Sequence, residues 1–104
     1  MKGFIKIKNK AGNSKLINIK YIQNIEVNFK REIETTMEGG GNYVLFAPKN
    51  DFEISEEFLN RMIDRIFYLL SDCEYDNVFI DIEVIKDDIT KELKEETERK
   101  NDNK

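Results

Sequence analysis

Arg61, Arg65 and Tyr68 are the residues of this 104-residue chain whose types and spacing come nearest to a ligand site. They are four and three residues apart, so a helix presents all three on one face. An arginine pair holds a phosphate by charge-assisted hydrogen bonds, and a neighbouring ring can stack a base. Because Glu57 can pair with Arg61 four residues later, an ordinary solvated helix face is the alternative. The spacing predicts an anion site, or a charged surface.

Phe79, Asp81 and Glu83 form a second candidate site with the opposite charge. They alternate with Val78, Ile80, Ile82 and Val84, so a strand would place them together on its outer face. An exposed aromatic side chain beside two carboxylates is typical of a surface that contacts a protein partner. Coverage of Phe79 by a terminal helix is the alternative.

The charges of the chain are segregated along its length. Residues 1–31 carry eight Lys or Arg against one acid, a net charge of +7, whereas residues 32–104 carry nine against twenty, a net charge of −11. An acidic surface can occupy the nucleic-acid groove of another protein, and a basic hairpin can bind phosphate. Alternatively, the two halves neutralise each other within the fold, or the lysines protect a strand edge from aggregation.

Catalytic and metal chemistry have few candidate residues here. The chain has no histidine, and Cys73 is its only cysteine. A histidine-based triad and a tetrahedral zinc site therefore lack their groups. The pair Asp87-Asp88 fits a helix cap better than a calcium loop. We expect no enzymatic activity, no cofactor and no metal.

The glycine run Gly39–Gly41 raises the question of a phosphate-binding loop. Such a loop leads from a strand into a helix. This run instead leads into the strand-like segment Tyr43 to Ala47. A hairpin turn that uses the conformational freedom of glycine is the better prediction.

One helix must position the first candidate site, and it is predicted from Ser55 to Leu70. Ser55 is suited to cap it, and Glu56 and Glu57 favour its first turn. An apolar stripe recurs at helical spacing. Its members are Leu59, Met62, Ile63, Ile66, Phe67 and Leu70.

Alternating patterns predict the strands that this helix covers. They are residues 4–8, 16–19, 25–29, 33–37, 43–47 and 78–84. Asp87 or Asp88 would cap a charged last helix that Ile85, Ile89 and Leu93 anchor, with fraying after about Glu96. We therefore predict an α+β fold: an antiparallel twisted sheet of five to six strands, one packed amphipathic helix and a charged C-terminal helix. Residues 1–86 would form the core domain and residues 87–104 the charged helix or tail.

The first 45 residues contain an ordered series of apolar and glycine positions. These are Ile5 and Ile7, Gly12, Leu16-Ile17-Asn18, Ile22, Ile25-Glu26, Ile33 and Gly39–Gly41 before Tyr43-Val44. In this order they resemble the small FlbD-type flagellar-associated proteins. The resemblance implies a compact module of strands that acts as a structural adaptor.

These observations together predict a cytoplasmic, non-enzymatic binding protein. No secretory signal and no long apolar run is present in the sequence, and the small core favours a homodimer. The specific hypothesis is a phage or mobile-element accessory factor that inhibits a host defence nuclease through the acidic surface of Phe79, Asp81 and Glu83. The alternatives are sequestration of a nucleotide at Arg61, Arg65 and Tyr68, or an FlbD-like adaptor.

Overall fold

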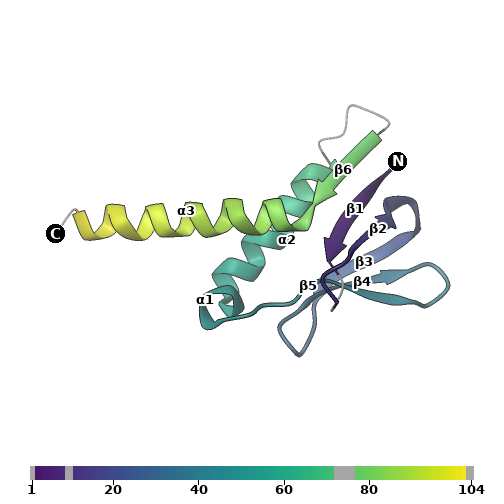
Figure 1. Ribbon diagram of the computed structural model, residues 1–104, viewed down its shortest axis with the longest axis horizontal. Coiled ribbons are helices and arrows are strands. Elements are labelled where there is room, and N and C mark those ends of the chain that lie inside the picture. Colours follow the sequence, from purple (N-terminus) through teal and green to yellow (C-terminus); the bar gives the residue numbers. More distant parts are fainter. Residues whose placement is uncertain (1, 9–10, 72–76, 103–104) are drawn as a thin grey trace.

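The computed structural model describes residues 2–8, 11–71 and 77–102, and it shows an α+β fold (Figure 1). The elements in chain order are β1 Lys2–Lys8, β2 Ser14–Asn18, the 3-10 turn η1 Ile19–Tyr21, β3 Ile22–Val27, β4 Ile33–Met37, β5 Asn42–Phe46, α1 Asp51–Ile54, α2 Glu56–Ser71, β6 Asn77–Asp81 and α3 Ile82–Asp102.

The described strands form two sheets of three strands each, so the prediction of one antiparallel sheet was wrong. The mixed sheet has the order β2-β1-β6, with β1 antiparallel to β2 and parallel to β6. The meander sheet has the order β3-β4-β5 and is antiparallel throughout. The two sheets part at η1, where the Asn18 side chain accepts a hydrogen bond from the backbone N–H of Lys20 and the chain leaves the first hairpin.

The predicted hairpins are confirmed. Ile5 lies opposite Ile17 across β1 and β2, and both side chains are buried. The loop between β4 and β5 is the glycine turn, in which Gly39 and Gly40 adopt positive φ angles of 92° and 95°. The run Gly39–Gly41 therefore closes a hairpin and opens no helix.

Helix α2 begins as predicted, because the hydroxyl oxygen of Ser55 accepts a hydrogen bond from the N–H of Phe58 at 3.2 Å. Leu59, Met62 and Ile66 are buried in the main core. Phe67 was predicted to belong to the same stripe, but its side chain is 69% exposed. The buried stripe is thus narrower than its sequence pattern, because Phe67 lies at the margin where α2 meets the edge strand β3.

The last strand is shorter, and the last helix begins earlier, than the sequence pattern suggested. The strand ends at Asp81, whose carboxylate accepts the backbone N–H of Glu83 at 3.0 Å. Asp81 therefore caps α3, and Asp87 and Asp88 lie inside the helix. Ile82 belongs to the alternating series of the predicted strand but also begins a series at helical spacing. Burial of the helical series decides that this segment is a helix.

The buried helical series consists of Ile82, Ile85, Ile89 and Leu93. Ile89 and Leu93 pack with the main core although they lie beyond the boundary expected at residue 86. The helix continues to Asp102, past the predicted fraying at Glu96, and its far half projects from the body of the molecule (Figure 1). None of the helices in the described ranges combines the length and apolar character that crossing a bilayer requires.

Candidate functional site

The structure brings Arg61, Arg65 and Tyr68 together on α2, but it places glutamates of α3 beside them. The guanidinium group of Arg61 donates to both carboxylate oxygens of Glu96, at 3.1 and 2.8 Å, and to Glu57 at 3.2 Å. Arg65 donates to Glu92. The two arginines therefore join α2 to α3.

The electrostatics of this pairing leave little attraction for an external anion. The hydrogen bond from Arg61 lowers the pKa of Glu96, and the same bond raises the pKa of Arg61. Asp64 and Glu92 line the adjacent shallow hollow together with Arg61, Arg65 and Tyr68. A phosphate there would have to displace carboxylates that are already bonded to the arginines.

The residues Phe79, Asp81 and Glu83 do not share one strand face. Phe79 lies on β6 and is 63% exposed. Asp81, at the end of β6, lies 3.8 Å from the ammonium group of Lys6. Glu83 is in α3 and pairs with Lys86 at 3.2 Å. Both carboxylates are thus partly neutralised by lysines of the same chain.

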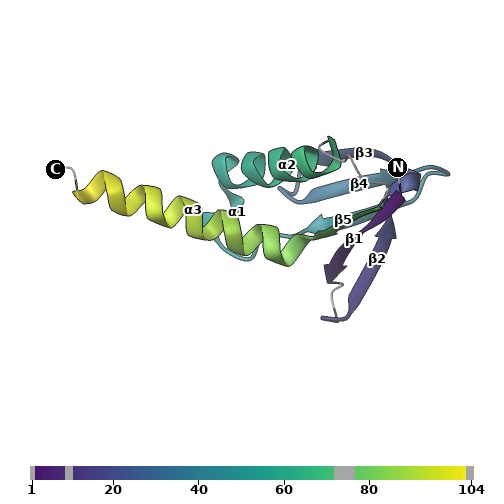
Figure 2. The same ribbon diagram turned by 90° about the horizontal axis from the view of Figure 1, so that it is seen from above.

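A third site, which the sequence patterns did not reveal, lies between the two sheets. Figure 2 shows that β1 and β2 turn away from the meander sheet. Residues of β5, β1, β2 and α3 line a cleft of about 490 Å³ there. That volume is within the range of about 300–1,000 Å³ that is usual for small-molecule pockets. We call it the intersheet cleft.

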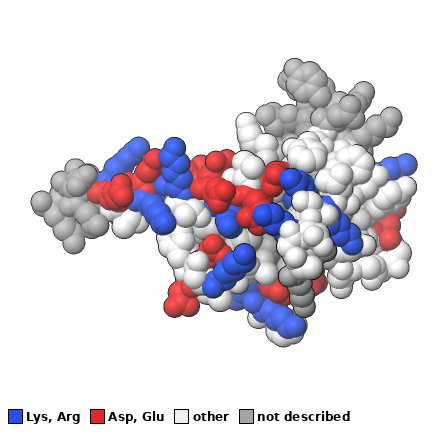
Figure 3. Space-filling model, in the orientation of Figure 1, with Lys and Arg blue, Asp and Glu red and all other residues white. Residues whose placement is uncertain are grey.

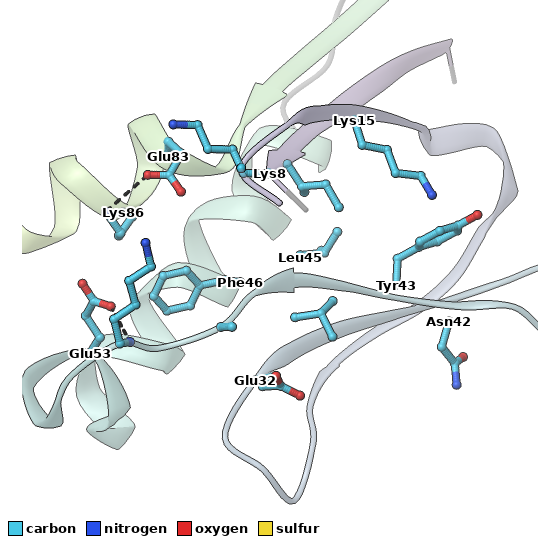
Figure 4. A pocket seen from close by; sticks show the side chains of 15 residues that line it. Lys8, Lys15, Glu32, Asn42, Tyr43, Leu45, Phe46, Glu53, Glu83 and Lys86 are labelled. Atoms are coloured by element: carbon cyan, nitrogen blue, oxygen red, sulfur yellow. Dashed lines mark hydrogen bonds and ion pairs between the residues drawn. The ribbon is translucent and has the colours of Figure 1, made fainter. Parts of the chain in front are cut away.

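The floor of the intersheet cleft is the edge of β5. Six consecutive residues, 42–47, line it. Successive side chains of a strand point to opposite faces, so all six can line one space only if the strand presents its edge to it. Tyr43 lies at one end and Phe46 at the other, with Leu45 between them (Figure 4). The cleft therefore offers an apolar and aromatic base.

Lysines surround this apolar base. Lys15 of β2 extends toward Tyr43, with its ammonium group 3.9 Å from the centre of the ring (Figure 4). At the other end, burial lowers the pKa of Lys86, but the hydrogen bond and charge of Glu83 outweigh it and hold that pKa above its ordinary value. Lys8 and Lys49 also line the cleft.

Each of the three carboxylates that line the intersheet cleft, those of Glu32, Glu53 and Glu83, has a partner within the chain. Glu53 is buried, and it accepts the backbone N–H of Lys49 at 2.9 Å. Glu32 accepts a hydrogen bond from the amide of Asn28. Within the described ranges, no carboxylate forms an ion pair with Lys8, Lys15 or Lys49. Three ammonium groups are thus available to a ligand.

The arrangement is suited to binding. Across the described residues, no cluster of three acidic or cysteine side chains is placed to hold a metal ion.

Sequence reasoning missed the cleft because its lysines come from four separate segments. The only signal was the excess of lysine in residues 1–31, which include Lys8 and Lys15.

Comparison of the chain with models of protein families, with curated protein sequences and with solved structures finds no match. The resemblance of the first 45 residues to FlbD-type proteins therefore stays a prediction.

Proposed function

We propose that the protein is a non-enzymatic binding protein that takes up an amphipathic anion in the intersheet cleft. The ligand would carry a flat apolar part and at least one phosphate or carboxylate group, as a nucleotide does. The observation that carries this proposal is the pairing of Lys15 with Tyr43 at the cleft, where a cation and an aromatic ring meet without a described carboxylate partner.

Physical chemistry favours an anion over a neutral ligand. Hydrogen bonds to charged groups contribute roughly 1.5–3 kcal/mol each, more than neutral ones. Lys8, Lys15 and Lys49 can each supply one, while Tyr43 offers aromatic surface to a ring. The sequence suggested that a nucleotide is sequestered at Arg61, Arg65 and Tyr68. We propose the intersheet cleft as the site instead.

Inhibition of a host defence nuclease through an acidic surface stays a prediction. The ion pairs of Asp81 with Lys6 and of Glu83 with Lys86 weigh against an acidic surface centred on these residues. The intersheet cleft is therefore the first site to test.

Calorimetric titration with a panel of nucleoside mono-, di- and triphosphates and aromatic carboxylates, at low and high salt, tests the proposal. At least one compound should bind, more weakly at high salt, and Lys15→Glu and Tyr43→Ala should each reduce its affinity about tenfold or more, which corresponds to about 1.4 kcal/mol. Lys20→Glu is the matched control, because Lys20 lies over Tyr21 at 5.7 Å, outside the cleft. No binding by any compound, or an equal loss in the control, would contradict the proposal.

A further inference from the structure

The intersheet cleft is lined by carboxylates as well as by ammonium groups. Four of its lining residues are lysines, namely Lys8, Lys15, Lys49 and Lys86. Three are glutamates, namely Glu32, Glu53 and Glu83. Four cations against three anions leave the described lining with a formal net charge of +1. Such a lining can neutralise one anionic group of a ligand, whereas every further anionic group adds repulsion from the glutamates.

Two of these glutamates lie at one end of the cleft. Figure 4 shows Glu53 and Glu83 near Phe46, whereas Lys15 extends toward Tyr43 at the opposite end. A ligand ring that stacks on Tyr43 brings an anionic group beside that ring close to Lys15. A longer chain of anionic groups has to continue along β5 toward the two glutamates, because residues 42–47 of that strand and its end line the cleft.

Glu83 also takes up one of the lysines at this end. Its carboxylate lies 3.2 Å from the ammonium group of Lys86. Lys8 points toward the same end in Figure 4, so an anionic group there meets ammonium groups and carboxylates together. Where α3 meets the strands, acidic and basic side chains likewise adjoin on the face shown in Figure 3, and neither sign forms a separate field. Glu83 thus lowers the positive charge that the cleft offers to a ligand.

We infer that the intersheet cleft selects a ligand with a single anionic group beside a flat ring, such as a nucleoside monophosphate or an aromatic monocarboxylate, and rejects polyphosphates, with Glu83 as a specificity-determining residue. This inference rests on the proposed function, because it concerns the ligand of the same cleft. A second or third anionic group loses water beside Glu53 and Glu83 without gaining a free positive charge. Unfavourable charge contacts with the wrong ligand are a general means of specificity.

Calorimetric titration with two matched series tests the number of anionic groups. One series is the mono-, di- and triphosphate of one nucleoside, and the other is benzene with one, two or three carboxylates. Divalent cations are left out because they would neutralise the added phosphates, and the ionic strength is held constant. In each series that binds, the affinity should fall by about fivefold or more from the first member to the third. The stronger series identifies the anionic group.

The outcomes separate this inference from the proposed function. An affinity that rises with each added phosphate or carboxylate would overturn the selection of a single anionic group, while uptake of an amphipathic anion would stand. No binding by any member of either series would overturn both.

Glu83→Gln tests the specificity-determining residue by a gain of affinity, which a damaged fold does not produce. The variant loses one carboxylate and releases Lys86, so the third member of the series should bind about fivefold or more tightly than it binds wild type, and the first member should gain less. Asp87→Asn is the matched control. It removes the same charge 3.8 Å from Lys86, but the Asp87 side chain is 74% exposed and does not line the cleft. An unchanged ratio of affinities in Glu83→Gln, or an equal change in Asp87→Asn, would overturn the role of Glu83.

Discussion

Gly3 and Val78 approach each other so closely across β1 and β6 that a Cβ atom at Gly3 would lie 2.1 Å from the carbonyl oxygen of Val78. The backbone of Gly3 also has a φ angle of 153°, which other residues rarely adopt. Gly3→Ala should therefore separate the parallel pair and lower the free energy of unfolding by at least about 2 kcal/mol. Urea denaturation followed by circular dichroism measures this loss.

Gly41→Ala is the control for this substitution. Gly41 has no heavy atom within 4 Å of its Cβ position and no positive φ angle. Its replacement should change the stability by no more than about 0.5 kcal/mol, as surface substitutions usually do. Equal effects of the two alanines would show that the approach of Gly3 to Val78 does not stabilise the mixed sheet.

Ile66→Asp should unfold the domain. The side chain of Ile66 is 0% exposed in the stripe of α2, and an unpaired buried charge costs several kcal/mol against a total stability of about 5–15 kcal/mol. Phe67→Asp changes the adjacent, exposed position and should retain a cooperative thermal transition. If Ile66→Asp melts as the wild type does, α2 is not the core helix.

The sequence predicts those parts of the fold in which the local pattern of residues is compatible with only one type of secondary structure. Ser55 and the stripe after it specify α2, and alternation with a glycine turn specifies β4 and β5. Ile82 fits both the two-residue period of a strand and the 3.6-residue period of a helix. Only its burial against the rest of the core selects the helix. The split into two sheets depends on the pairing of β1 with β6, about 75 residues away, which no local pattern encodes.

For the candidate sites, the sequence predicted some of the residues but not how the fold brings them together. Arg61 and Arg65 were correctly expected on one helix face. Their partners Glu92 and Glu96 lie on α3, and no local pattern in the sequence predicts how α3 packs against α2. The carboxylate of Glu96 binds Arg61 of α2, a contact between two helices that helical spacing alone does not predict. Lys8, Lys15, Lys49 and Lys86 meet only because the two sheets diverge.

Thr35→Val should lower the free energy of unfolding by about 1 kcal/mol, because it removes a hydrogen bond to a backbone carbonyl in the core. Thr35 is 0% exposed, and its hydroxyl donates to the carbonyl oxygen of Asn24 at 2.9 Å. That bond spans β4 and β3 next to the register shift between Ile22 and Asn24. Thr36→Val, at the next and less buried position, is the control in the same urea denaturation. A loss no larger than that of the control would mean that the hydroxyl is not needed there.

Acid should weaken the attachment of α3 to α2 through Glu96. The hydrogen bond from Arg61 holds the pKa of Glu96 below its ordinary value in the folded chain. A carboxyl group with a lowered pKa stabilises the fold above its unfolded pKa, about 4.3 for glutamate, and that contribution disappears as the pH falls through the folded value. Glu96→Gln should therefore lower the melting temperature slightly at pH 7, and the difference from wild type should vanish at strongly acidic pH.

Glu95→Gln removes the same charge from an exposed position of α3 and separates this pairing from a general charge effect. Melting curves of the three proteins between pH 7 and pH 2 give the comparison, and added salt should reduce the Glu96 effect because both partners are accessible to solvent. If Glu96→Gln and Glu95→Gln follow the same pH dependence, the bidentate contact with Arg61 does not contribute to folding.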